Sequence, residues 1–220
     1  MPERGSLVVI SGFSGAGKGT VVKQLRALNP AYWVSISMTT RQKRPGEQEG
    51  VDYYFVSREE FEKEIAQNGL LEFTAYVNNY YGTPRKYVES MLCEGRDVIL
   101  EIESNGGAQV KEIFPGAILI FLTAPDAETL AQRLRGRGTE SDEVIEGRLR
   151  RAQEESRIIG RYDYLLVNEE GKAAECAEKI DKIVRISRAE TERQRELIES
   201  LQTGFDRLLA QHREASGSPA

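Results

Sequence analysis

Seven consecutive residues near the N-terminus have the composition and spacing of a phosphate-binding loop. Gly12 to Lys18 reads Gly-Phe-Ser-Gly-Ala-Gly-Lys, which is the pattern G-x-x-x-x-G-K, and it follows the apolar run Leu7 to Ser11. Glycines let backbone N–H groups face phosphate oxygens, and the helix expected to follow adds the positive end of its dipole. The residues expected to hold the phosphates of a nucleotide are Gly12, Phe13, Ser14, Gly15, Ala16, Gly17, Lys18, Gly19 and Thr20.

The residue after the lysine departs from the usual form of this loop. The common pattern places a Ser or Thr there, whose hydroxyl binds Mg²⁺, whereas this chain has Gly19 and then Thr20. Mg²⁺ readily keeps several water ligands, so we expect it to bind together with the nucleotide. Two alternatives stay open for the metal: Thr20 contributes a ligand, or the ion is held more through water.

The loop predicts nucleotide binding but leaves the reaction open, because motors, GTPases and small-molecule kinases share it. A GTPase would offer an Asn-Lys-x-Asp segment for guanine. The chain has none, since Asn168 is followed by Glu-Glu-Gly. The residues after the loop must therefore identify the reaction.

Several further segments, taken in order, are similar to those of guanylate kinases. They are Ser-Ile-Ser-Met-Thr-Thr-Arg-Gln-Lys-Arg-Pro-Gly-Glu at 35–47, Gly-Val-Asp-Tyr-Tyr-Phe-Val at 50–56, Glu72, Asn-Tyr-Tyr-Gly-Thr-Pro at 79–84, Arg-Gly-Arg-Gly-Thr at 135–139 and Tyr-Asp-Tyr at 162–164. The resemblance covers about residues 7–183. Because independent segments agree, it is far more specific than the loop alone.

This resemblance implies both a reaction and an architecture. The reaction is transfer of the γ-phosphoryl group of ATP to GMP, giving ADP and GDP, with Mg²⁺ bound with ATP. The architecture is an α/β fold: a P-loop kinase core whose parallel sheet is flanked by helices, an inserted GMP-binding lobe of short strands plus a helix, and a helical lid.

The side chains that the resemblance assigns to GMP suit a purine monophosphate. Arginine forks and phenolic hydroxyls contact phosphate well. Guanine presents N1–H and an exocyclic amine on one edge, and the carboxylate of Glu72 is expected to accept both; Ser37 and Thr83 are expected near its O6. The implied GMP-binding set is Ser37, Arg41, Arg44, Glu47, Tyr53, Glu72, Tyr81, Thr83 and Glu103.

The predicted strand from Asp97 ends in acidic residues. By resemblance, Glu103 contacts the guanine amine from a position where the family commonly has Asp. Glu is one methylene longer, so its reach differs by ~1.5 Å. Glu101 is expected to orient metal-bound water.

Phosphoryl transfer needs positive charge around a developing polyanion, and the acceptor phosphate is itself an anionic nucleophile, so no general base is required. By resemblance, Arg133, Arg137 and Arg148 are lid arginines, and Asn168 lies near adenine. The expected catalytic residues are Lys18, Arg41, Arg133, Arg137 and Arg148. Arg150 and Arg151 are interpreted as part of a charged, exposed helix face.

Two other functions are weighed against this one. A catalytically silent guanylate-kinase-like interaction domain would tolerate loss of Lys18 or of the lid arginines, and both are present. A kinase for another nucleoside monophosphate is disfavoured by Glu72 together with Arg41 and Arg44.

The elements that must position these residues alternate between strand and helix, which favours a parallel sheet with helices on both faces. Strands are predicted at 7–11, 33–37, 97–102, 117–122 and 162–167. The GMP-binding lobe is expected at about 38–92, with a helix opening at the capping box Ser57-Arg58-Glu59-Glu60, and the lid at about 133–161. Residues 1–188 are expected to form the guanylate-kinase-like domain.

Past about Lys172 the pattern predicts continuous helix, and 189–220 is expected to be an amphipathic extension with a frayed tail. Leu197, Leu201, Phe205 and Leu208 form one apolar stripe. Packing against the chain's own body and a contact between subunits of a homo-oligomer are both open interpretations.

Composition excludes several classes of function. One His and two Cys among 220 residues disfavour zinc sites and Ser-His-Asp chemistry, and a net charge of −5 disfavours nucleic acid as a partner. No apolar run approaches the ~20 residues of a membrane span, and we see no signal peptide. The expected compartment is the cytoplasm.

Overall fold

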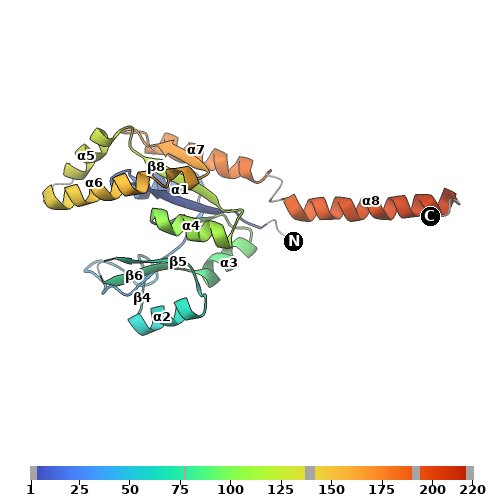
Figure 1. Cartoon of the computed structure of the whole chain (residues 1–220), viewed down its shortest axis with the longest axis horizontal. Coiled ribbons are helices and arrows are strands. Elements are labelled where there is room, and N and C mark those ends of the chain that lie inside the picture. The colour runs from blue at the N-terminus through green and yellow to red at the C-terminus, as the bar shows by residue number, and fades with distance from the viewer. Residues whose placement is uncertain (1–3, 77, 137–141, 190–193, 217–220) are drawn as a thin grey trace. The chain divides into compact units, whose positions relative to one another are not determined.

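The computed structural model describes residues 4–76, 78–136, 142–189 and 194–216 (Figure 1). The chain divides into two compact units, one reaching to Val184 and the other starting at Arg185. Within the described residues, no helix is both long enough and apolar enough to span a bilayer.

The first unit is built on a five-stranded sheet in the order β2-β7-β1-β8-β9, and every neighbouring pair is parallel. The strands are β1 (Leu7–Gly12), β2 (Trp33–Val34), β7 (Val98–Glu101), β8 (Ile118–Thr123) and β9 (Tyr164–Val167). Strand β1 lies in the centre and is buried along its whole length, which explains its unbroken apolar run.

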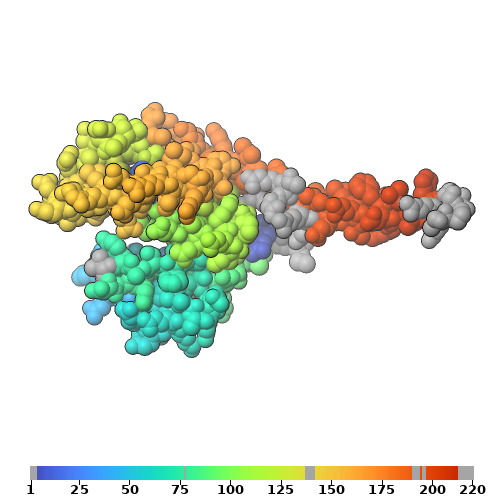
Figure 2. Space-filling view, viewed as in Figure 1, coloured from blue at the N-terminus to red at the C-terminus, as the bar shows by residue number. Residues whose placement is uncertain are grey.

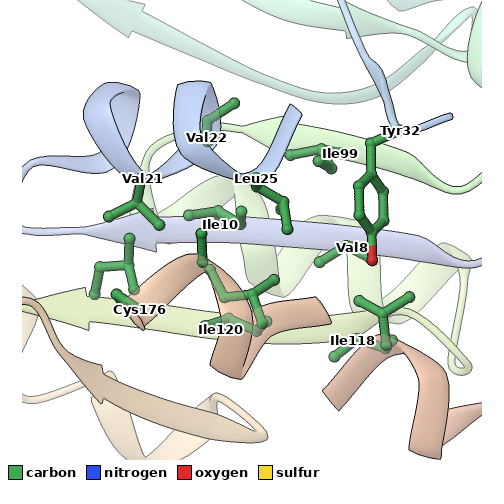
Figure 3. Close-up of a cluster of buried hydrophobic side chains, with 14 of the residues drawn as sticks. Val8, Ile10, Val21, Val22, Leu25, Tyr32, Ile99, Ile118, Ile120 and Cys176 are labelled. Atoms are coloured by element: carbon green, nitrogen blue, oxygen red, sulfur yellow. The ribbon is translucent and has the colours of Figure 1, made fainter. Parts of the chain in front are cut away.

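Helices cover both faces of this sheet: α1 (Lys18–Leu28) and α7 (Ala173–Ser187) pack on one face, and α3 (Arg85–Cys93) and α4 (Ser104–Ile113) on the other. The unit also contains α5 (Ala127–Arg135), α6 (Asp142–Ser156) and the 3₁₀ turn η1 (Ile159–Arg161), and α5 packs against α6. Val8 and Ile10 of β1 pack with α1 and α7 (Figure 3), whereas Val9 packs with α3 and α4. The core therefore has two layers, separated by the alternation of side chains along β1.

A second, four-stranded sheet forms the lobe that was expected between the core strands. It contains β3 (Met38–Thr39), β4 (Tyr54–Phe55), β5 (Leu70–Tyr76) and β6 (Asn79–Pro84) in the order β4-β3-β6-β5, with helix α2 (Arg58–Ala66). Its surface is drawn in blue and blue-green in Figure 2. The capping box at Ser57 is confirmed: its hydroxyl accepts from Glu60 N at 3.1 Å, and the Glu60 carboxylate accepts from Ser57 N at 2.8 Å.

The strand predicted at 33–37 is shorter than expected, because it ends at Val34. Ser35 N still donates to Ile99 O at 2.9 Å, but Ser37 O already accepts from Tyr54 N in the lobe. The chain therefore leaves one sheet for the other within three residues. The sequence of residues 33–37 continues a strand-like pattern through this point and does not show where the change of sheet occurs.

The continuous helix predicted past Lys172 is wrong. Helix α7 ends at Ser187, a turn follows in which Ala189 N donates to Ile186 O, and α8 runs over Arg195–Ser216. The Gln194 side chain donates to Arg188 O at 2.7 Å, so a carbonyl at the end of α7 is capped by a side chain. On α8, the apolar side chains of Leu197, Leu201, Phe205 and Leu208 are about half exposed or more.

Candidate active site

The phosphate loop connects β1 to α1 at the carboxyl end of the central strand. Gly17 is the N-cap of α1 and has φ +85°, and a Cβ there would lie 2.6 Å from Asn168 Nδ2, so only glycine fits. No side chain caps the helix. Its first N–H groups are therefore available to an anion at the positive end of the helix dipole.

Lys18 lines a polar pocket of about 320 Å³. The pocket is lined by Phe13, Ser14, Gly15, Gly17, Lys18, Gly19, Thr20 and Glu101. The Lys18 ammonium donates to Gly12 O at 2.6 Å, within the loop itself. The amine is thus held beside the loop where the phosphates of a nucleotide would lie.

Glu101, the last residue of β7, faces the start of α1. Gly19 occupies the position at which this loop usually has a metal-binding Ser or Thr. A Cβ at Gly19 would lie 3.7 Å from Glu101 Oε1, so the Glu101 carboxylate is next to that position. Burial raises the pKa of Glu101, and the positive charge of Lys18 opposes that effect. With the hydroxyl of Thr20 in the same pocket, the donors are hard oxygens, which fit Mg²⁺.

Asn168 follows β9 and fixes the phosphate loop from the edge of the sheet. Its Nδ2 donates to Ala16 O at 2.8 Å, and its buried Oδ1 accepts no hydrogen bond from any residue that the structure describes. Arg133, near the end of α5, donates to Asn168 O at 3.0 Å. The loop, the end of β9 and α5 therefore meet at one place.

Arg148 of α6 also reaches the phosphate loop, because its guanidinium donates to Ser14 Oγ at 2.6 Å. Two of the three arginines assigned to the lid, Arg133 and Arg148, thus converge on the loop or its support. The third, Arg137, lies outside the described residues. The helix expected to begin near Ser141 is α6, whose first residue is Asp142.

In the lobe, Arg41 is held by Glu47 in a two-pronged ion pair with N–O distances of 2.7 and 3.0 Å. The guanidinium also lies over the Tyr53 ring, 5.4 Å from its centre. The hydrogen-bonded ion pair with Arg41 lowers the pKa of Glu47. Arg44 N donates to the same carboxylate, while the Arg44 side chain is exposed. Glu47 therefore organises both arginines.

The two tyrosines of the lobe lie together, with ring centres 6.0 Å apart. Tyr53 comes from the loop before β4 and Tyr81 from β6, and burial raises the pKa of Tyr53. Ser37 is half-buried directly before β3. The lobe thus gathers a guanidinium and two phenols within one small area.

Glu72 of β5 is buried, with 5% of its surface exposed, and accepts a hydrogen bond from Thr83 Oγ1 at 2.6 Å. Burial raises its pKa to about 7, and the charge of Glu103 adds to the shift. A Cβ at Gly106 would lie 2.7 Å from Glu72 Oε2, so α4 approaches this carboxylate closely. Glu103 is the N-cap of α4.

Sequence reasoning missed the contact of Arg151 with the carboxylate of Glu103. Arg150 is exposed and pairs with Glu146 on its own helix, as the interpretation of a charged face requires. Arg151 instead donates to Glu103 Oε2 at 3.0 Å. Arg151 also pairs with the buried Glu155, four residues on, but Arg150 has Glu154 at the same spacing, so the sequence alone does not separate the two arginines.

Comparisons with known proteins agree on one family. A family model described as guanylate kinase matches residues 4–186. A guanylate kinase of Latilactobacillus sakei is 51% identical over 84% of this chain and 90% of its own length, and one of Lactococcus lactis is 52% identical over 84% and 89%. A crystal structure of guanylate kinase from Anaplasma phagocytophilum superimposes with a TM-score of 0.69 at 32% identity, covering 90% of this chain and 96% of that one.

Proposed function

The chain belongs to the guanylate kinase family, and we propose that the residues described above perform that family's reaction, transfer of the γ-phosphoryl group of ATP to GMP. The protein is an ATP:GMP phosphotransferase. The single observation that carries the assignment of the acceptor site is the buried Glu72, held by Thr83 in the lobe.

At the donor side, the loop binds the phosphates of ATP with its backbone N–H groups and Lys18. Arg133 and Arg148 add positive charge where the transferring group becomes more anionic. Arg137 is proposed for the same role on the basis of the family resemblance. These groups orient and stabilise; they exchange no proton with the substrate.

Mg²⁺ bound with ATP would neutralise phosphate charge, and Glu101 and Thr20 are the residues that would hold it or its water ligands. Asn168 keeps the loop in shape through its hydrogen bond to Ala16 O, and on the basis of the family resemblance it is proposed to lie near the adenine of ATP.

At the acceptor side, Arg41, Arg44, Tyr53 and Tyr81 bind the phosphate of GMP, with Glu47 holding Arg41 in place until the substrate arrives. Ionised Glu72 accepts from guanine N1–H and from the exocyclic amine. The hydroxyls of Ser37 and Thr83 lie toward O6, and Glu103 lies toward the amine. A base without this donor pair leaves the buried carboxylate unpaired, which is the source of selectivity.

The pKa of Glu72 gives GMP binding a dependence on pH. The carboxylate must be ionised to accept two N–H groups, and burial raises its pKa to about 7 in the free enzyme. We therefore expect kcat/KM for GMP to rise as the pH increases from about 6 to about 8. Initial rates across this range at saturating ATP measure the effect.

The control for this pH dependence is Glu72→Gln, since the phosphate of a nucleotide also gains its second charge near pH 6. The part of the rise that comes from Glu72 should be missing in the variant. An identical profile in both proteins would assign the whole dependence to the substrate.

A coupled assay with ATP and, in turn, GMP, AMP, UMP and dTMP tests the proposed function against its rivals. We expect turnover with GMP and little with the others. Absence of turnover with any acceptor would favour a protein-interaction module, and preference for a different acceptor would contradict the role of Glu72.

We further propose that the enzyme works in the cytoplasm with ATP and GMP, without nucleic acid or membrane, and that α8 associates with the α8 of a second copy. Helix α8 lies beyond the residues that the family model matches and exposes a stripe of large apolar side chains. In an antiparallel pair, Phe205 lies opposite Gly204, which has open space around it, and Leu201 lies opposite Leu208.

Truncation after Arg188 is therefore expected to lower the oligomeric mass, because the stripe is removed. Light scattering measures this, and an unchanged mass would eliminate the role of α8. In the full chain, Leu201→Glu with Leu208→Glu should act in the same way. Thr203→Glu is the matched control, since Thr203 is exposed on the opposite side of the helix.

A further inference from the structure

Arg151 joins three parts of the first unit through one guanidinium. It is a residue of α6, and its NH2 donates to Glu103 Oε2, at the start of α4, at 3.0 Å. Its Nε donates to Glu155 Oε1 at 3.3 Å. The guanidinium carbon of Arg151 lies 5.7 Å from the centre of the Tyr76 ring, at the end of β5. The elements it joins are α6 in yellow-orange, α4 in green and β5 in blue-green (Figures 1 and 2).

The position of the guanidinium is fixed from the α6 side. Glu155 is buried, with 8% of its surface exposed, and it also accepts from Ser104 Oγ at 3.2 Å. Glu103 and Ser104 are adjacent at the start of α4, so Glu155 and Arg151 hold two successive residues there. One end of the Arg151 fork is thus anchored, and the other end determines where the Glu103 carboxylate lies.

The ion pair between Arg151 and Glu103 places a positive charge beside a group of carboxylates. Burial raises the pKa of both Glu72 and Glu155, and the negative charge of Glu103 adds to both shifts, so Glu103 repels each of these carboxylates. Among the residues that the structure describes, Arg151 is the basic side chain that pairs with Glu103. It uses Oε2, and Oε1 of Glu103 accepts no hydrogen bond from the described residues, so an acceptor remains for a ligand.

We propose that Arg151 is a positioning residue that fixes Glu103 for recognition of the 2-amino group of guanine, so that discrimination between GMP and IMP depends on it. IMP has the same purine and phosphate but lacks that amino group. The inference rests on the proposed role of Glu103. A glutamate has one more rotatable bond than an aspartate, so it needs a partner to hold one conformation.

The test is steady-state kinetics with GMP and IMP for Arg151→Ala, Arg151→Lys and Glu103→Gln. We expect Arg151→Ala to lower the ratio of kcat/KM for GMP to that for IMP by roughly three- to tenfold, through KM for GMP, because a partly exposed charged hydrogen bond is lost. Arg151→Lys should restore part of the ratio, since an ammonium keeps the charge but not the planar fork. Glu103→Gln should lower the ratio at least as much.

Arg150→Ala is the matched control, because it removes the same charge from the neighbouring position of α6 and should leave the ratio unchanged. A lower ratio in Glu103→Gln with a normal ratio in Arg151→Ala would overturn the inference while leaving Glu103 in its role. An unchanged ratio in Glu103→Gln would overturn the role of Glu103 and the inference with it. Equal losses with GMP and IMP in Arg151→Ala, accompanied by a lower melting temperature, would show a structural role alone and would also overturn it.

Discussion

Replacing Lys18 with alanine is expected to lower kcat by about 100- to 1,000-fold, the usual cost of removing one preorganised group from a developing oxyanion. The ammonium lies in the pocket formed by the phosphate loop and donates to Gly12 O. When ATP binds, that donor is free to turn to the β and γ phosphates, where charge accumulates during transfer. Coupled-assay kinetics at saturating ATP and GMP measure the loss.

Lys23→Ala provides the comparison, because Lys23 is an exposed residue of the same helix, and its loss changes the net charge equally. It should retain nearly normal turnover. Near-normal turnover in Lys18→Ala, with an unchanged melting temperature, would refute the role of the lysine in transfer.

Replacing Glu72 with glutamine is expected to lower kcat/KM for GMP by about 10- to 100-fold and to relax the choice of base. The amide keeps the shape of the side chain but offers one acceptor oxygen instead of two, so guanine loses a hydrogen bond to a charged group. Bases without the N1–H and amine pair lose less, because they made no such pair. Kinetics with GMP and AMP compare the two effects.

The expected loss of activity in Glu72→Gln does not come from loss of folding. Burial raises the pKa of Glu72 to about 7, so above that pH the folded state carries the cost of a buried charge, which glutamine removes. The variant should therefore unfold at the same temperature as the wild type or higher at pH 8. Unchanged GMP kinetics would mean that another carboxylate, such as Glu103, reads guanine.

Local signals in the sequence predicted local structure well. The glycine and lysine spacing placed the phosphate loop between β1 and α1, and the four residues from Ser57 predicted a helix start that is present with both hydrogen bonds. Such features depend on neighbours along the chain. Strand β2 was predicted less well, because a distant segment ends it: after Val34 the chain pairs with Tyr54 of the lobe. The turn after α7 was also missed, although its contacts are local, because the residues there continue the helical pattern of the sequence.

The site shows the same division. The residue types in the lobe predicted phosphate and guanine binding, but not that Glu47 already occupies Arg41 or that Arg151 holds Glu103. Both contacts depend on how surfaces meet across the fold. Arg150 and Arg151 are indistinguishable in the sequence, and only the packing of α6 against α4 separates them.

The sheet order also constrains how the protein forms during its synthesis. Strand β1 leaves the ribosome early, yet it pairs with β7 and β8, which follow only after the whole lobe has been made. The lobe pairs within itself, with β5 and β6 adjacent along the chain, so its loop closure is cheaper. Pairing of β5 with β6 can thus form early on the nascent chain, but Leu71 of β5 packs with Val98 and Val110, which are made later. The strand that precedes the phosphate loop waits for the same segment, an interval in which apolar residues are exposed to chaperones and to aggregation.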